Sequence, residues 1–338
     1  MNSNHNIIIH GIHCRRIKKI ILAGILSLGA FTVSIMIGTM DFSYSQIWQG
    51  LWKASSDPLT NQIIHSIRLP RVLTGFLVGM HLSVAGALLQ GILRNPLASP
   101  HIIGVNAGAG FVAVLVMIFA PGQFHLIPMG SFMGALGAAL LVYLLAAKSQ
   151  NSSTLHIVLA GVAVSALLNA LTSGLMYINS DDLQITYSWL LGSLSGRSWQ
   201  YLNILWPYSA VGLTTAFFLS PKLNLFQLGD EVGSSLGLSV KLYRMLIIVV
   251  AAILAGSGVS VAGTIGFIGL AAPHLARLLV GNDYRYSLLL SGLLGGCLLV
   301  ASDTLARSLF QPVELSVGIV TAILGAPFFL FLLYKKSA

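Results

Sequence analysis

The longest polar stretch between two strongly apolar segments of this chain is PKLNLFQLGDEVGSSLGLSVKLYR, residues 221–244. Apolar runs of membrane-spanning length flank it at 201–220 and 242–264. A chain that leaves the membrane between two such runs has to emerge there into water. The stretch therefore predicts a loop that joins two membrane-crossing segments and meets something soluble.

Glycines punctuate this loop. Gly229, Gly233 and Gly237 separate two short leucine-bearing segments, 223–228 and 232–238. Because glycine tolerates the backbone angles of tight turns, the pattern predicts two short helices joined by a turn. Such a unit can dock on a soluble partner, and a plain solvated connector is the alternative that these residues alone leave open.

The composition places the chain in a membrane. Of its 338 residues, 56% are hydrophobic and 8% are charged, whereas soluble domains hold about 25% charged residues. The 35 glycines suit close helix packing in lipid, where small residues let backbones approach. The net charge of +9 indicates orientation in the membrane rather than a nucleic-acid partner. Cys14 and Cys297 offer no disulfide framework.

Apolar runs of spanning length follow one another along the chain. They lie at about 20–40, 70–93, 101–121, 126–147, 155–178, 201–220, 242–264, 266–281, 286–309 and 313–334. Lipid admits only helices or closed barrels, and these runs lack the alternation of barrel strands, so we predict an all-α polytopic membrane protein with about ten transmembrane helices. Small residues recur every four positions in 70–93 and predict a helix contact: Gly75, Gly79, Ser83, Ala87 and Gly91. We expect the short run at 266–281 to be broken at Pro273.

Basic residues orient these spans. A basic N-terminal tail, 1–19, precedes a single transmembrane domain, 20–334, and a short C-terminal tail, 335–338. The first run reads as a retained span with a cytoplasmic N-terminus, and an even number of spans returns the C-terminus to the cytoplasm. This topology leaves few of the 18 cations outside, as the positive-inside rule predicts: Lys53, Arg68, Arg71, Arg197 and Arg307. Residues 221–244 then face the cytoplasm.

Motifs for catalysis and for ion coupling are missing from the sequence. No Gly-Lys pair occurs, so the chain has no Walker A loop for ATP. The nine acids fall in loops or near span ends, whereas ion-coupled carriers place carboxylates deep in the membrane. Ion coupling therefore lacks its usual residues, and we predict that the chain is not an enzyme.

Histidines are the remaining candidates for chemistry. The polar N-terminal tail contains four residues of metal-binding types: His5, His10, His13 and Cys14. Their spacing is too irregular for a metal site, so we predict that no metal binds there. His81 and His274 lie inside predicted spans, where a polar ring is a functional candidate by default. An imidazole bonded to neighbouring backbone is the favoured interpretation for both.

Long motifs in a fixed order identify a family resemblance. The first is RLPRVLTGFLVGMHLSVAGALLQGILRNPLASPHIIGVNAGAGF at 68–111. The others are LAGVAVSALLNAL at 159–171, LGDEVGSSLGLSV at 228–240, GTIGFIGLAAPHLARLLVGNDYR at 263–285, SDTLARSLF at 302–310 and ELSVGIVTAILGAPFFLFLL at 314–333. Together they resemble the membrane permeases of binding-protein-dependent importers for iron-siderophores, haem and vitamin B12, the FecCD-type permeases. The resemblance covers the chain from about residue 20 onward.

The resemblance implies an assembly. It has the architecture of a type II ABC importer, with a second permease subunit of the same or a related kind, two cytoplasmic ABC ATPase subunits and an external substrate-binding protein. Its setting is the lipid of a bacterial cytoplasmic (inner) membrane. The permease would bind no cofactor, ATP and Mg being used by the partner ATPase, and nucleic acid would not be a partner.

The resemblance also implies roles for three groups of residues. The loop 221–244 looks like the family's coupling helices. Their contact with the ATPase would be made by Leu228, Gly229, Glu231, Leu236 and Gly237. Outward-facing arginines that meet acids of the binding protein match Arg68, Arg71 and Arg307. Part of a cytoplasmic gate matches Asn95, Leu97 and Thr154.

Other interpretations of these residues stay open. The arginines can instead anchor the protein at the membrane surface or pair with Asp303 and Glu314. Asn95-Pro96 is also an ordinary helix terminator.

For the translocation path that the resemblance implies, we expect an uncharged, apolar wall formed around 160–169 and 318–326. The expected cargo is an iron-siderophore, with vitamin B12 or haem as the alternative and an ATP-independent channel or ion-coupled carrier as the competitor from another class.

Overall fold

The computed structural model of the chain describes residues 2–38, 43–52, 57–148, 154–179, 183–311 and 313–337. Its helices are α1 (Asn2–Met36), α2 (Tyr44–Leu51), α3 (Pro58–Gln62), α4 (Leu69–Leu93), α5 (Val105–Phe119), α6 (Ile127–Ala147), α7 (Thr154–Ile178), α8 (Leu183–Leu190), α9 (Trp199–Phe226), α10 (Asp230–Ser235), α11 (Val240–Ala262), α12 (Ile268–Val280), α13 (Tyr284–Ser308) and α14 (Val317–Ser337). A π-helical turn, η1 (Ile63–Arg68), precedes α4, and two 3-10 turns, η2 (Pro100–Ile103) and η3 (Phe124–Leu126), precede α5 and α6.

The prediction of an all-α membrane protein is confirmed. Within the described ranges, seven helical segments are long and apolar enough to cross a membrane. Three shorter apolar helices, α5, α12 and the first part of α14, account for the other predicted spans. The short helix α2 begins at a capping box formed by Ser43 and Gln46.

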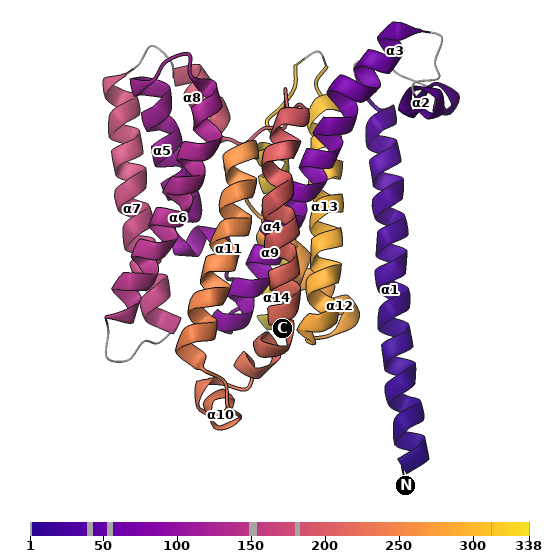
Figure 1. Cartoon of the computed structure of the whole chain (residues 1–338), viewed down its shortest axis with the longest axis vertical. Helices are drawn as coiled ribbons and strands as arrows, with labels where there is room; N and C mark the ends of the chain where they lie inside the picture. The colour runs from indigo at the N-terminus through magenta and orange to yellow at the C-terminus, as the bar shows by residue number, and fades with distance from the viewer. Residues whose placement is uncertain are drawn as a thin grey trace.

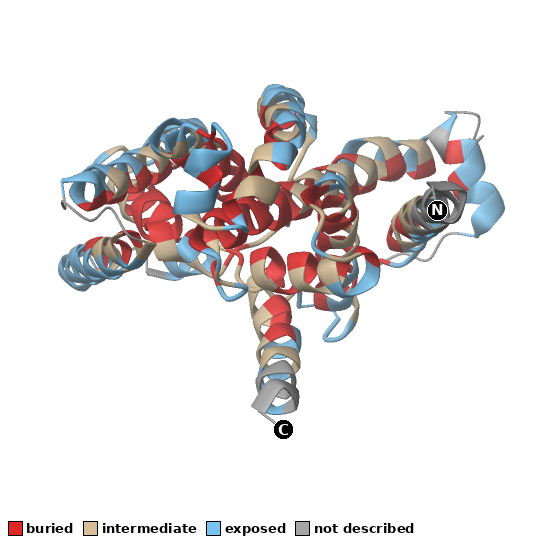
Figure 2. Ribbon diagram, turned by 90° about the horizontal axis from the view of Figure 1, so that it is seen from below, coloured by how far each residue is buried: buried red, intermediate tan, exposed pale blue. Residues whose placement is uncertain are grey.

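The helices form one bundle with two distinct ends (Figure 1). α5, α6, α7 and α8 lie together on one flank, α1 lies on the opposite flank, and α4, α9, α11 and α13 lie between them. The N-terminus and α10 lie toward one end, and α2 and α3 lie at the other. Buried residues gather in the middle of the bundle, and exposed residues cover the outer faces of the flanking helices (Figure 2).

Helix α4 forms the centre of this bundle because its glycines admit neighbouring backbones. A β-carbon on Gly79 would lie 2.3 Å from the carbonyl oxygen of Gly295 on α13, and one on Gly86 would lie 1.8 Å from that of Gly269 on α12. No side chain fits at either position, so the backbones themselves are in contact. The predicted small-residue face of 70–93 is thus a packing face.

The prediction of two short helices in the loop 221–244 is wrong in part. Residues 223–226 continue α9 through Pro221, and only α10 is a separate short helix. The reason is burial: Leu223 and Phe226 are 0% and 1% exposed, so the apolar face of α9 extends past the proline. The chain turns at Gly229, whose φ of +100° favours glycine.

The predicted break at Pro273 is also absent. α12 runs continuously through Pro273. A proline deprives the carbonyl four residues earlier of its backbone donor, and here the side chain of Gln90 donates to that carbonyl, Gly269 O, at 3.3 Å. The interruption lies just before α12, where Gly263 and Phe267 have φ values of +73° and +65°.

The predicted N-terminal tail is part of a helix: α1 begins at Asn2 and continues into the first span. Its inner end is fixed to the α12–α13 turn: His13 Nδ1 lies 2.5 Å from the Tyr286 hydroxyl, and an Arg16 guanidinium nitrogen lies 3.7 Å from an Asp283 carboxylate oxygen. His13 and Arg16 therefore connect α1 to the start of α13.

Candidate functional site

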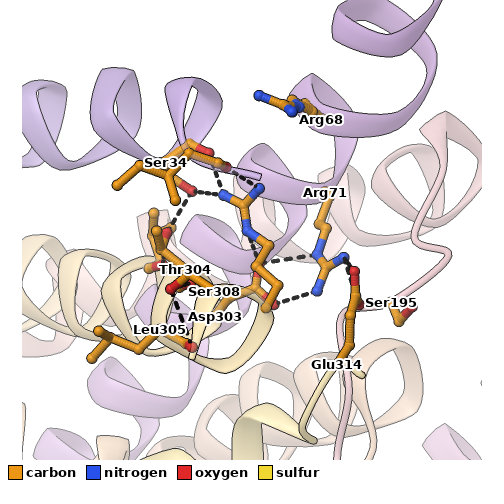
Figure 3. Close-up of polar contacts among 12 residues, drawn as sticks. Ser34, Arg68, Arg71, Ser195, Asp303, Thr304, Leu305, Ser308 and Glu314 are labelled. Atoms are coloured by element: carbon orange, nitrogen blue, oxygen red, sulfur yellow. Dashed lines mark hydrogen bonds and ion pairs between the residues drawn. The ribbon is translucent and has the colours of Figure 1, made fainter. Parts of the chain in front are cut away.

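At the end of the bundle opposite α10, Arg71 of α4 forms a buried ion pair with Asp303 of α13. The guanidinium donates from Nε and Nη2 to the two carboxylate oxygens at 3.0 and 2.9 Å, and from Nη1 to Glu314 at 3.0 Å (Figure 3). Such a fork geometry makes a strong, oriented contact. For Arg71, pairing with Asp303 and Glu314, one of the interpretations left open by the sequence, is what the structure contains.

Arg307 and Arg68 bind the C-terminal end of α1. Arg307 donates from Nη1 to the carbonyl of Ile37 at 2.6 Å and from Nη2 to the Ser34 hydroxyl at 2.8 Å, and its Nε lies 3.8 Å from Asp303. Arg68 donates from Nη1 to the carbonyls of Ile35 and Met36 at 2.5 and 2.9 Å. The predicted docking arginines are thus brought together, but each is less than a tenth exposed and already bonded within the chain. Their role in docking stays a prediction.

At the opposite end, the predicted coupling residues form one protrusion. Leu228 and Leu236, on either side of α10, are 56% and 58% exposed. Gly229 and Gly237 turn the chain with φ values of +100° and +85°. Glu231 is exposed in the first turn of α10, where a negative charge is favoured by the helix dipole.

A charged contact fixes this protrusion to the bundle. Arg244 of α11 donates to a carboxylate oxygen of Asp230 at 2.5 Å, and its guanidinium lies 5.8 Å from the ring centre of Phe226. Leu238, 4% exposed, packs into the core behind α10. The exposed apolar tip is thus attached to both α9 and α11.

The predicted gate residues divide into two groups. Asn95 and Leu97 share the turn after α4, where the Leu97 N–H donates to the Asn95 side-chain oxygen at 2.9 Å. Gln90 closes this turn by donating to the Ala98 carbonyl at 3.1 Å. Thr154 instead begins α7 and is half-buried.

The turn of Asn95 adjoins the coupling protrusion, a contact that sequence reasoning missed. A β-carbon placed on Gly229 would lie 3.3 Å from a guanidinium nitrogen of Arg94. Arg94 immediately precedes Asn95, and its φ of +49° is unusual for a residue other than glycine. In the sequence, the only indication for Arg94 was its position next to Asn95. That position does not show that Arg94 lies close to Gly229.

A cavity of about 870 Å³ opens along α7. Its wall consists of His101, Asn106, Ala107, Gly110, Ser165, Asn169, Thr172, Ser173, Met176, Tyr177, Tyr187, Leu190 and Thr264. The wall is uncharged apart from the titratable His101, and 160–169 contributes to it as expected. It is not simply apolar, because amides, hydroxyls and an imidazole line it. Residues 318–326 border a smaller cavity of about 200 Å³ instead.

The imidazoles differ in their surroundings. His101, which the sequence analysis did not single out, lies on the large cavity with its Nε2 3.2 Å from the Asn106 amide nitrogen. His81 is fully buried between three helices, 2.7 Å from the Ser209 hydroxyl and 2.9 Å from that of Ser257. His81 is thus bonded to side chains of α9 and α11, and it also has the predicted hydrogen bond to neighbouring backbone, at Leu254.

Known proteins resemble this chain in sequence and in fold. The model of the FecCD transport family matches residues 22–335. The Fe(3+)-citrate import system permease protein YfmD of Bacillus subtilis (strain 168) is 38% identical, over 95% of each chain. The hemin transport system permease protein HmuU of Yersinia pestis is 37% identical, over 94% of each. A solved structure of a transporter assigned to the metal-chelate ABC type, in an inward-facing conformation, superposes with a TM-score of 0.85 at 33% identity, covering 94% of this chain and 99% of that one.

Proposed function

Because this chain belongs to the FecCD transport family, the permease subunits of ABC importers for iron chelates, haem or vitamin B12, we propose that it forms the membrane path for an iron-siderophore complex. The path would be completed by a second permease subunit, identical or related. An external binding protein would deliver the cargo, and two ATPase subunits on the cytoplasmic side would supply the energy. The membrane would be the bacterial cytoplasmic membrane.

The wall of the 870 Å³ cavity is the observation that supports this cargo. Iron-siderophore complexes are bulky and present many oxygen atoms, which accept hydrogen bonds from hydroxyl and amide groups. Asn169, Thr172 and Ser173 of α7 offer such groups on the cavity wall. A neutral wall can bond the passing chelate weakly and release it, because the bonds exchange with water at little net cost.

The protrusion around α10 supports coupling to a separate ATPase. Leu228 and Leu236 are exposed at the cytoplasmic end, where a protein surface, and not lipid, would cover them. The chain has no Gly-Lys pair for a Walker A loop of its own. We infer that closure of the ATPases pushes this protrusion and that Arg94, beside Gly229, passes the displacement to the turn of Asn95 and Leu97.

The experiment is uptake by the complete transporter in proteoliposomes, with radioactive iron in ferrichrome, hemin and cyanocobalamin offered separately. We expect ATP-dependent uptake of the iron-siderophore, and loss of uptake in the double variant Leu228→Ala, Leu236→Ala. The matched control is Leu278→Ala, Leu279→Ala, which removes two exposed leucines from α12, 66% and 45% exposed, outside the protrusion. Uptake by the chain alone, without ATP, would overturn the assignment in favour of a channel or carrier.

Haem is the second candidate, because a haem permease is nearly as similar to this chain as a ferric citrate permease is. Preference for hemin over ferrichrome in the same experiment would establish it. A flat, largely apolar porphyrin would leave the amides and hydroxyls of the cavity wall without partners, which disfavours haem here.

A further inference from the structure

The described cations at the outer end differ in how their charge is balanced. Arg71 and Arg307 lie against Asp303, and Arg68 is bonded to backbone carbonyls. Arg197, in the loop between α8 and α9, has no carboxylate within ion-pairing distance among the described residues. Its guanidinium lies 4.6 Å from the ring centre of Tyr201, and its buried Nε donates no hydrogen bond within the described part of the chain. Besides its contact with Tyr201, Arg197 thus carries a positive charge that no described carboxylate balances, and such a buried charge favours an anionic partner.

Arg197 borders a second cavity, of about 430 Å³. Polar side chains around this opening include Ser193, Ser195, Tyr201 and Glu314. Glu314 is already bonded to Arg71, and Figure 3 shows Ser195 beside it. Since the charge of Glu314 is balanced by Arg71, the cavity keeps the uncompensated positive charge of Arg197. Such a site suits a carboxylate, which a guanidinium can bind with two parallel hydrogen bonds.

Helix α8 separates this cavity from the large one. Ile185, Ser188 and Trp189 border the 430 Å³ cavity. Tyr187 and Leu190, from the same helix, border the 870 Å³ cavity. A group that fills the smaller cavity therefore presses on a helix that also forms the wall of the larger one.

We propose that the Arg197 cavity is a docking socket for an acidic side chain of the external binding protein, and that α8 connects this socket to the cargo path. The inference rests on the proposed function, because it requires an external binding protein. It adds Arg197 to the three arginines whose docking role is a prediction: Arg68, Arg71 and Arg307.

The test measures binding of the substrate-free binding protein to the complete transporter in lipid nanodiscs. Arg197→Gln should weaken binding at least about tenfold, because a buried charged pair loses one member. Arg197→Lys keeps the charge without the planar fork and should give a smaller loss. Gln200→Glu is the matched control: it lowers the outer charge by the same amount at an exposed position of α9 and should leave binding within about twofold.

Partner rescue identifies the acid. Surface acids of the binding protein are changed to Lys one at a time, and one of them should restore binding to the Arg197→Glu transporter. Thermal unfolding of each purified variant shows whether the fold is intact. Unchanged affinity in a folded Arg197→Gln variant overturns the socket while leaving the proposed function standing, whereas absence of binding to the unaltered transporter overturns the proposed function itself. A variant that binds the binding protein normally but has lost affinity for free ferric citrate would show that the carboxylate belongs to the cargo, which also overturns the proposal.

Discussion

Gly161 of α7 lies against the carbonyl of Ile102 in η2, so closely that a β-carbon on Gly161 would be 1.7 Å from the carbonyl oxygen. The turn that contains Ile102 also places His101 on the 870 Å³ cavity. The contact therefore sets the position of α7, which forms one wall of that cavity, relative to the turn that forms another.

The Gly161 contact predicts opposite effects for two glycines on one helix. Gly161→Ala should lower stability by about 1–3 kcal/mol, because the added methyl group displaces backbone. Gly174 has no atom within 4 Å of its β-carbon position, so Gly174→Ala should raise stability by about 0.5–1 kcal/mol through helix propensity. Thermal unfolding of the purified chain in detergent measures both. Equal effects of the two substitutions would contradict the close contact.

The order and class of the helices could be predicted from hydropathy alone, because each span needs an apolar run of its own. Breaks within the helices could not. α12 passes through Pro273 because Gln90, far away in sequence, replaces the missing donor. The break falls instead at Phe267, whose positive φ has no sequence signature.

The candidate sites were predictable to the extent that their residues are close in sequence. Leu228 and Leu236 flank one glycine-bounded turn, and their shared exposure was expected. Arg71 and Asp303 are 232 positions apart, so their pairing could be given only as one of several alternatives until the packing of α4 on α13 was known. The socket of Arg197 needs α8, α9 and the segment before α14 at once, so no local pattern indicates it.

His81 is predicted to be structural. Its two serine partners each also lie within hydrogen-bonding distance of a backbone carbonyl: Ser209 Oγ is 3.0 Å from Leu205 O and Ser257 Oγ is 2.9 Å from Leu254 O. His81→Leu therefore leaves both hydroxyls with partners and should preserve transport by the assembled importer, with a stability change of about 1 kcal/mol. His81→Asp, which puts a carboxylate in the same place, should prevent folding. Loss of transport in a well-folded His81→Leu variant would instead give the imidazole a chemical role.

Gln90 is predicted to stabilise both the turn of Asn95 and Leu97 and helix α12. Gln90→Met removes the hydrogen bonds to Ala98 and Gly269 while keeping the length of the side chain. The expected loss of stability is about 1–2 kcal/mol, the size of hydrogen bonds between helices in membranes. Hydrogen exchange at the amides of α12 should become faster. Gln200→Met, at an exposed position of α9, is the control and should change neither quantity; unaltered exchange in the Gln90→Met variant would show that α12 needs no outside donor.

The ion pairs of Arg71 predict unequal effects for the two acids that share it. Asp303 is 2% exposed and lies against both Arg71 and Arg307. Asp303→Ala leaves two buried guanidinium groups short of a counter-ion and should lower stability by about 3–5 kcal/mol. The Glu314 side chain is 32% exposed, and without it Arg71 keeps Asp303, so Glu314→Ala should lower stability by about 1 kcal/mol or less. Chemical denaturation of the purified chain compares the two variants, and similar losses for both would mean that burial does not set the strength of these pairs.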